Sequence, residues 1–235
     1  MIKIYMGDIA ALSDGNIYRK YMELLDETRR NKVRQCRNDK DKKRSLLAGY
    51  LIQVGVKEWI REESGLQADA TPLSLSYVYG EDGKPYLRDH KDIHFNISHS
   101  GQYVIAAFSS EEVGIDIQHH RELRTDIAGR FFSAQDKELL KRMEDREDGF
   151  YRMWAVKEAY MKLTGEGMRQ GMDVTAMKTE GEGSIIILDK GIIYKKEQEN
   201  NSAYFWIYDK IMKYSIAVCS YGETADINIK EIKVM

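Results

Sequence analysis

A chain of 235 residues is long enough to bury one large hydrophobic core or two smaller ones. Its 43% hydrophobic and 31% charged residues are typical of globular proteins, and a net charge of −2 gives no overall positive field for nucleic acid, so we expect no nucleic-acid partner. No apolar run approaches the ~20 residues that span a bilayer. We therefore expect a cytoplasmic protein without a membrane partner. Its two cysteines, Cys36 and Cys219, lack metal-site spacing and are expected to be free thiols.

The first 85 residues predict two helices between short strands. A Ser-Asp pair at 13–14 can cap a helix that runs to about residue 35, and a second, amphipathic helix is expected from 39 to about 65. Strands are expected at 1–6 and 75–79. Residues 80–85, rich in glycine and charge, are expected to be a turn.

Residues 94–118 predict three strands. The first breaks into the turn Ser98–Gly101, the second is the apolar run Tyr103–Phe108, and the third is Val113–Gln118. Because side chains on a strand point alternately to its two faces, Asp116 and Gln118 share a face. A carboxylate and an amide there are suitable oxygen ligands for Mg²⁺. A half-exposed strand with a polar face explains the same pattern.

The second half of the chain predicts two helices followed by strands. Arg121–Phe132 mixes basic and apolar residues, and Ser133–Asp136 resembles a capping box that opens a short helix to about Met143. A longer helix is expected over Phe150–Lys162, ending at Gly165. The expected strands after it are 174–178, 184–188, 192–196, 203–208 and 214–219.

The helix over Phe150–Lys162 has an unusual face. Trp154, Glu158 and Lys162 are spaced four residues apart and lie on one side of it. A Glu–Lys surface pair, worth about 0.2–0.5 kcal/mol, explains two of the three. A tryptophan on the same face indicates that the face lines a cleft.

Five segments of the chain, in order, resemble the signature of the Sfp-type 4′-phosphopantetheinyl transferases: Gly83–Pro85, Phe95–Ser100, Gly114–Ile117, Phe131–Ser133 and Trp154–Ala159. The resemblance implies an α+β fold (α/β in the broad sense) with two pseudo-symmetric halves, each a long helix packed on a mostly antiparallel sheet. A faint similarity between residues 103–109 and 214–220 agrees with two related halves. We divide the chain into 1–110 and 111–235.

The resemblance also implies the ligands of each half. The first half would carry the 3′-phosphate and adenine side of coenzyme A, and the second the metal and carrier-protein side. The coenzyme A contacts that it implies are Arg29, Lys32, Arg44, Lys84, Pro85, Ser98, His99, Lys157 and Lys162. The metal ligands for Mg²⁺ would be Asp116, Gln118 and Glu158. Because carrier proteins are acidic around their serine, we expect a basic rim around an apolar contact, and the predicted carrier-protein contacts are Arg121, Arg124, Ile127, Arg130 and Phe131. The charged stretch around Arg29 also fits a solvated helix face.

By the same resemblance, a serine hydroxyl of an apo acyl or peptidyl carrier protein attacks the β-phosphate of coenzyme A, and 3′,5′-ADP leaves. The catalytic residues would be Asp116, Glu158 and Lys162, and the protein would be a monomer. Glu158 is expected to take the serine proton directly or through water, with Asp136 as the second candidate. Gln118 stands where many family members carry a third acid, so it is expected to bind the metal weakly or through water.

Three other functions fit parts of this sequence. A Ser-His-Asp hydrolase is rejected, because Ser98 and His99 are adjacent in an extended segment and point opposite ways. A Mg²⁺-dependent nucleotide phosphoester hydrolase would release 3′,5′-ADP without an acceptor. A non-catalytic module that binds coenzyme A or a carrier would explain Gln118 as decayed metal binding, although Asp116 and Glu158 are both present.

Overall fold

The computed structural model of the protein describes residues 1–65, 71–81, 83–122, 127–165, 174–175, 190–195, 198–208, 211–222 and 226–235. The chain forms two compact units. Unit 1 contains Met1–Tyr79, Pro85–Ser110 and Ala225–Met235, and unit 2 contains Gly80–Lys84 and Glu111–Thr224. Segment 80–84 thus belongs to unit 2 although unit 1 flanks it in the sequence. Segment 225–235 belongs to unit 1 although it follows unit 2 in the sequence.

Unit 1 is built on a four-stranded sheet with the order β11-β1-β5-β4. Its strands are β1 (Ile2–Asp8), β4 (His94–Ser100), β5 (Tyr103–Ser109) and β11 (Ile227–Glu231). All neighbours are antiparallel except β1 and β11, which run parallel and pair Ile2 with Ile227. Strand β4 continues through Ser100, so the turn predicted at 98–101 is restricted to Gly101 and Gln102, where Gly101 has a positive φ of 55°.

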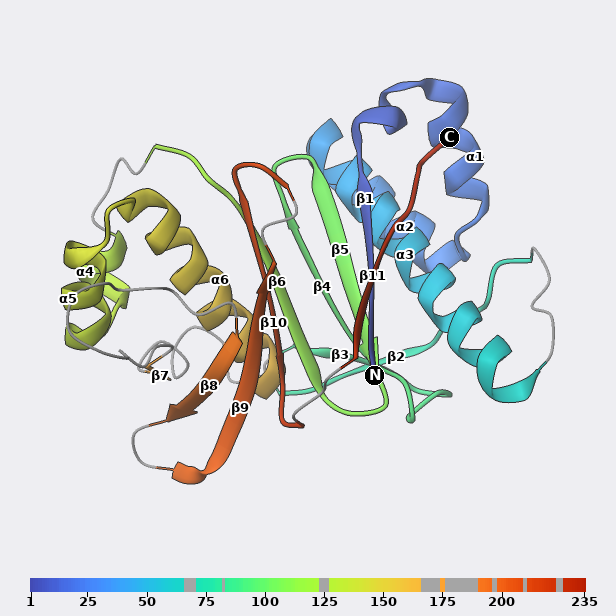
Figure 1. The fold of residues 1–235 in the computed structure, drawn as a ribbon. Helices are drawn as coiled ribbons and strands as arrows, with labels where there is room; N and C mark the ends of the chain where they lie inside the picture. Colours follow the sequence, from blue (N-terminus) through green and yellow to red (C-terminus); the bar gives the residue numbers. More distant parts are fainter. Residues whose placement is uncertain are drawn as a thin grey trace. The chain divides into compact units, whose positions relative to one another are not determined.

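The helices of unit 1 are arranged so that the longest packs on this sheet and two shorter ones pack on the longest (Figure 1). They are η1 (Ala10–Ser13), α1 (Gly15–Glu23), α2 (Glu27–Gln35) and α3 (Asp39–Ser64), with a small hairpin of β2 (Tyr77–Tyr79) and β3 (Pro85–Leu87). The single helix predicted from 14 to 35 is wrong. Asp14 caps α1, but Asp26 caps α2 by accepting from the Arg29 N–H at 2.9 Å, so a second helix begins there.

Helix α3 carries the core of unit 1. It lies against β5 and β1, and its buried leucines pack with Tyr5, Phe95 and Phe108. A Cβ added to Gly55 would lie 2.2 Å from the Phe108 ring, so this glycine permits the close approach of helix and sheet. Asn38 caps the N-terminus of α3, and the predicted end near residue 65 is confirmed, with Gly65 in the left-handed conformation.

Unit 2 repeats the arrangement with a five-stranded antiparallel sheet in the order β6-β10-β9-β8-β7 (Figure 1). Its strands are β6 (Val113–His119), β7 (Val174–Thr175), β8 (Lys190–Lys195), β9 (Gln198–Tyr208) and β10 (Tyr214–Ser220). Its helices are α4 (Ile127–Phe131), α5 (Ala134–Arg142) and α6 (Arg146–Thr164), and α6 packs on β6 and β10. The strand predicted at 184–188 and most of that at 174–178 lie outside the described residues.

Each unit by itself therefore has a long helix on a mostly antiparallel sheet, and the α+β prediction is confirmed. None of the helices in the described part of the chain has both the length and the apolar character needed to cross a membrane.

Candidate functional site

Strand β6 presents Asp116 and Gln118 toward helix α6. Its other face is apolar, and Val113, Ile115 and Ile117 on it are fully buried. Gly114 shares the polar face, and a Cβ added there would lie 1.9 Å from the Ala159 carbonyl oxygen of α6. Because side chains alternate along a strand, Asp116 follows Gly114 on the helix side, where its side chain is almost completely buried.

Helix α6 brings Lys162 to Asp116. The Lys162 ammonium donates to Asp116 Oδ1 at 2.6 Å and to the Ile115 carbonyl at 3.2 Å. Asp116 Oδ2 accepts from the Gln118 amide nitrogen at 2.7 Å. Both carboxylate oxygens of Asp116 thus have a partner, and Gln118 acts here as a donor rather than as an oxygen ligand.

Glu158 lies one turn before Lys162 and within electrostatic reach of Asp116. Burial raises the pKa of Glu158, the negative charge of Asp116 raises it further, and the Lys162 ammonium works in the opposite direction. A carboxylate with a raised pKa is a stronger base than an ordinary glutamate. The structure therefore brings together the three residues predicted to be catalytic, Asp116, Glu158 and Lys162.

Within the described part of the chain, no three His, Cys, Asp or Glu side chains gather where they could hold a metal ion. The donor set that does gather is two carboxylates and the amide of Gln118. Mg²⁺ commonly binds through one or two protein carboxylates and completes its shell with water and substrate phosphates, so this set fits Mg²⁺ in the presence of a phosphate ligand. Direct ligation by Gln118 requires its amide to turn, since its nitrogen faces Asp116.

Lys157, predicted to contact coenzyme A, lies in the core of unit 2. Its side chain has no exposed surface, and its ammonium forms an ion pair of 2.7 Å with the equally buried Asp136. It also lies 5.5 Å from the centre of the Phe132 ring. A buried pair of this kind is costly to separate. The structure thus gives both Lys157 and Asp136, the second candidate base, a partner inside the protein.

Trp154, on the face predicted to line a cleft, has aromatic neighbours within unit 2. It is half-buried in an aromatic cluster with Phe131, Phe132 and Phe150, with ring centres 5.7, 6.2 and 5.7 Å away. Phe131 and Phe132, at and just after the end of α4, thus pack on one side of the tryptophan, and the cleft stays a prediction.

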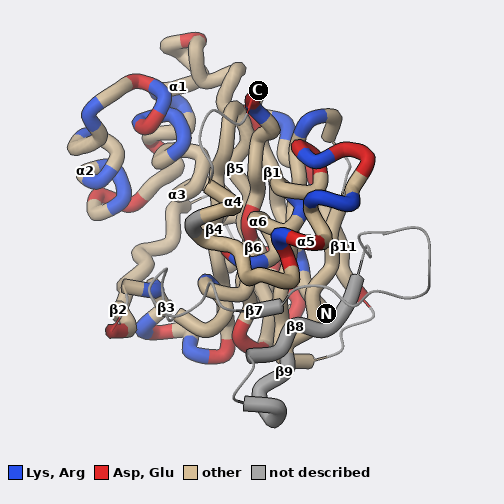
Figure 2. The backbone as a smooth tube through the Cα atoms, turned by 90° about the vertical axis from the view of Figure 1, so that its left-hand side faces the viewer, with Lys and Arg blue, Asp and Glu red and all other residues tan. Residues whose placement is uncertain are grey.

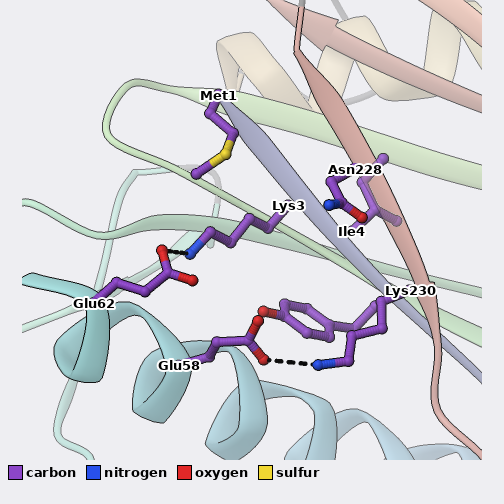
Figure 3. A pocket seen from close by; sticks show the side chains of 8 residues that line it. Met1, Lys3, Ile4, Glu58, Glu62, Asn228 and Lys230 are labelled. Carbon is purple, nitrogen blue, oxygen red and sulfur yellow. Dashed lines mark hydrogen bonds and ion pairs between the residues drawn. The ribbon is translucent and has the colours of Figure 1, made fainter.

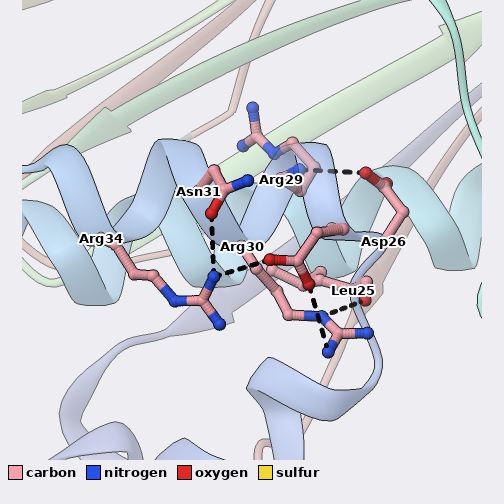
Figure 4. A network of polar contacts seen from close by, with 7 residues as sticks. Leu25, Asp26, Arg29, Arg30, Asn31 and Arg34 are labelled. Carbon is pink, nitrogen blue, oxygen red and sulfur yellow. Dashed lines mark hydrogen bonds and ion pairs between the residues drawn. The ribbon is translucent and has the colours of Figure 1, made fainter.

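In unit 1, Arg29 extends from α2 toward α3. One terminal nitrogen donates to the Ser45 carbonyl at 3.1 Å, and its Nε is buried without a partner among the described residues. Gly49 leaves the space, because a Cβ there would lie 2.9 Å from that Nε. Figure 4 shows the Arg29 guanidinium on the opposite side of α2 from those of Arg30 and Arg34.

The charges of α2 are divided between its faces. Arg30 and Arg34 share the carboxylate of Glu27, at 3.6 and 2.7 Å. Figure 2 shows the resulting mixture of basic and acidic residues on this helix. Lys32 instead has a lowered pKa, first because its ammonium is desolvated and second because Arg29 is near. An anion bound beside Arg29 and Lys32 would relieve this repulsion.

Arg44 lies in the first turns of α3. One terminal nitrogen donates to the Gly101 carbonyl at 2.7 Å, the other lies 3.4 Å from Asp41, and its Nε is buried without a partner in the described residues. Gly101 lies in the turn just after β4, the strand that carries Ser98 and His99. As predicted from their adjacency, Ser98 is buried and His99 exposed, so the two side chains point to opposite faces of the strand.

Lys84 and Pro85 stand where the chain passes from unit 2 to unit 1. Lys84 is buried, and its ammonium pairs with Glu112 and donates to the Leu163 carbonyl at 2.8 Å. Burial lowers the pKa of Lys84, and Glu112 opposes this shift. The sequence did not predict a role for Glu112, because no local pattern links it to Lys84, 28 positions earlier.

The predicted carrier contacts are described only in part. Arg121 is exposed, and Ile127 and Phe131 are half-buried on α4. Arg124 lies outside the described residues, as does the side chain of Arg130.

Unit 1 also contains a cavity of about 470 Å³ beside β1, lined by charged residues of α3 and β11 (Figure 3). Lys3 pairs with Glu62, and Lys230 pairs with Glu58 at 3.1 Å. The charges that line it are thus satisfied within the protein, and none of the predicted site residues faces it.

Comparison with known proteins agrees with this geometry. Residues 112–219 match the family "4′-phosphopantetheinyl transferase superfamily", and residues 15–111 match "4′-phosphopantetheinyl transferase, N-terminal". The chain is 30% identical to the 4′-phosphopantetheinyl transferase Sfp of Bacillus subtilis (strain 168) over 203 residues, which is 86% of this chain and 84% of that protein. It is 32% identical to the 4′-phosphopantetheinyl transferase psf-1 of Bacillus pumilus over 189 residues, 77% of each chain. The chain belongs to the Sfp-type 4′-phosphopantetheinyl transferases.

Proposed function

We propose that this protein transfers the phosphopantetheinyl arm of coenzyme A to a serine of an apo carrier protein in a Mg²⁺-dependent reaction that releases 3′,5′-ADP. The transferase class follows from the family. The observation that carries the proposed mechanism is the contact of Asp116 with Lys162, beside a Glu158 whose pKa is raised.

The two units suit different groups of coenzyme A. We propose that Arg29, Lys32 and Arg44 of unit 1 bind the 3′-phosphate. Support comes from Arg29 and Arg44, because the Nε donor of each is buried without a hydrogen-bond partner among the described residues. The lowered pKa of Lys32 is further support. Arginine suits this role because its planar fork donates two hydrogen bonds to a phosphate. His99, exposed on β4, is proposed to assist.

In unit 2, Asp116 and Glu158 are proposed to hold Mg²⁺, with Gln118 contributing through water. When bound, the ion would neutralise the diphosphate and the charge that develops on the leaving group. Lys162 is proposed to move from Asp116 to a diphosphate oxygen, since its side chain is only partly buried.

Transfer itself needs a proton acceptor. The serine oxygen forms a bond to the β-phosphorus, the bond from that phosphorus to the bridging oxygen breaks, and the serine proton goes to Glu158 directly or through a water molecule. All of these residues come from one chain, so we propose that the protein acts as a monomer.

Mass spectrometry of apo carriers incubated with protein, coenzyme A and Mg²⁺ tests the proposal. The expected result is a gain of one phosphopantetheinyl group on the acceptor serine and an equal amount of 3′,5′-ADP. Release of 3′,5′-ADP without modified carrier would identify a hydrolase instead. Binding of coenzyme A without either product would identify a binding module.

The pH dependence tests Glu158 as the base. If its carboxylate accepts the serine proton, kcat/KM, which reports the groups of the free protein, should fall as the pH decreases through the raised pKa of Glu158. Because the Lys162 ammonium lowers that pKa, Lys162→Met should reduce kcat and shift the acidic limb of the pH–rate profile to higher pH. Lys141→Met, at an exposed lysine of α5, is the control and should leave the limb in place. A limb that stays in place in Lys162→Met would assign the base to another group.

Arg29 can be tested with coenzyme A that lacks the 3′-phosphate. Arg29→Met should raise the KM for coenzyme A about tenfold, as expected for losing a charged hydrogen bond worth ~1.5 kcal/mol. It should leave the KM for dephospho-coenzyme A unchanged. Arg34→Met, on the same helix but paired with Glu27, is the matched control and should change neither. An equal rise for both substrates would show that Arg29 does not read the 3′-phosphate.

A further inference from the structure

The chain that leaves β6 is tied to α6 through one tyrosine. The Tyr151 hydroxyl accepts from the Arg121 N–H at 3.0 Å and donates to the Arg121 carbonyl at 2.9 Å. A single phenol thereby satisfies both backbone groups of a residue outside any helix or strand. Tyr151 itself is 8% exposed, so this pair of hydrogen bonds is largely shielded from water.

His120 fixes the tyrosine ring in place. The two rings stack with centres 4.8 Å apart and planes 6° from parallel. His120 Nε2 lies 2.8 Å from the hydroxyl of the fully buried Ser215, and the His120 N–H donates to the Lys213 carbonyl at 2.8 Å. The Tyr151 ring, whose hydroxyl binds Arg121, therefore stacks on a histidine that is anchored to β10 and to the turn before it.

The guanidinium of Arg121 is also positioned. Its Nε donates to His119 Nδ1 at 3.2 Å, and the His119 ring packs on Tyr214 with centres 4.6 Å apart. An exposed arginine normally loses about 0.5–1.5 kcal/mol of side-chain entropy when a partner immobilises it. Here both its backbone and its side chain are restrained in advance, at an exposed position.

We propose that Tyr151 is a positioning residue that pre-organises Arg121 to bind an acidic group on the carrier protein. The inference rests on the proposed function, and it builds on the prediction from the sequence that Arg121 contacts the carrier. It places the role of Tyr151 in carrier binding and not in the chemical step. Asp116 lies five residues before Arg121 and is held by its own contact with Lys162. That contact does not involve Tyr151.

The test is Tyr151→Phe, which removes the hydroxyl and keeps the ring that stacks on His120. We expect the KM for apo carrier to rise about five- to tenfold, as for two lost hydrogen bonds, while kcat and the KM for coenzyme A change less than twofold. Arg121→Ala should raise the carrier KM to a similar degree. In the double variant the two effects should not multiply, because both act through Arg121.

Tyr204→Phe on β9 is the matched control and should leave all three constants unchanged. A carrier KM unchanged in Tyr151→Phe, or a rise that multiplies with that of Arg121→Ala, would overturn the proposal even where the variant has a lower melting temperature. These outcomes are separate from a failure of the proposed function, which would appear as absence of carrier modification by the unmodified protein.

Discussion

Asp116→Asn should lower kcat about 10²–10³-fold, the loss typical of removing one group that stabilises charge in a transition state. The amide retains the size of the carboxylate but carries no charge for Mg²⁺ and no charged acceptor for Lys162. Lys162 is partly exposed, so the cost in stability should be below the ~3–5 kcal/mol of breaking a fully buried pair. Steady-state kinetics with carrier and coenzyme A, together with thermal unfolding, measures both quantities.

Gln118→Glu is the matched variant, with the opposite expected effect on Mg²⁺ binding. It adds a third carboxylate beside Asp116 and Glu158, so Mg²⁺ should bind more tightly in the absence of coenzyme A, as measured by calorimetric titration. Asp116→Asn should abolish that binding. Equal Mg²⁺ affinity in Gln118→Glu, Asp116→Asn and the unmodified protein would show that these residues do not hold the ion.

Gly114→Ala should reduce the free energy of unfolding by about 3 kcal/mol or more, at or beyond the upper end for overpacked cores. The added methyl group would lie 1.9 Å from the Ala159 carbonyl oxygen and 2.6 Å from the Leu163 nitrogen. Both are backbone atoms, so a side chain cannot rotate to make room, and β6 must move away from α6. Urea denaturation measures the loss.

Gly15→Ala is the control for this variant. Gly15 begins α1, and nothing lies within 4 Å of an added Cβ. Because alanine loses less backbone entropy than glycine on folding, this change should be neutral or slightly stabilising. Equal destabilisation by both substitutions would show that the contact between β6 and α6 is not the cause.

The parts of this fold that could be predicted from the sequence have local signals. The cap at Asn38, the end at Gly65 and the alternation in β6 each involve residues within a few positions of one another. The same locality explains the site: Asp116 and Gln118 share a strand face, and Glu158 and Lys162 are one helical turn apart.

What the sequence did not indicate depends on distant partners. Strand β11 pairs with β1 across more than 200 residues, and its short charged sequence does not by itself predict a strand. The resemblance implied that Lys157 contacts coenzyme A, and no local signal in the sequence links it to Asp136, which neutralises it in the core. The break between α1 and α2 does have a local signal, the cap residue Asp26, which the longer helical pattern obscured.

The parallel pairing of β1 with β11 has a consequence for synthesis on the ribosome. Strand β1 is made before β11, and all of unit 2 is translated in between. At roughly 5–20 residues per second, one edge of β1 stays without its neighbour for about 10–40 s. During that time a nascent chain has an open strand edge on which another chain can pair.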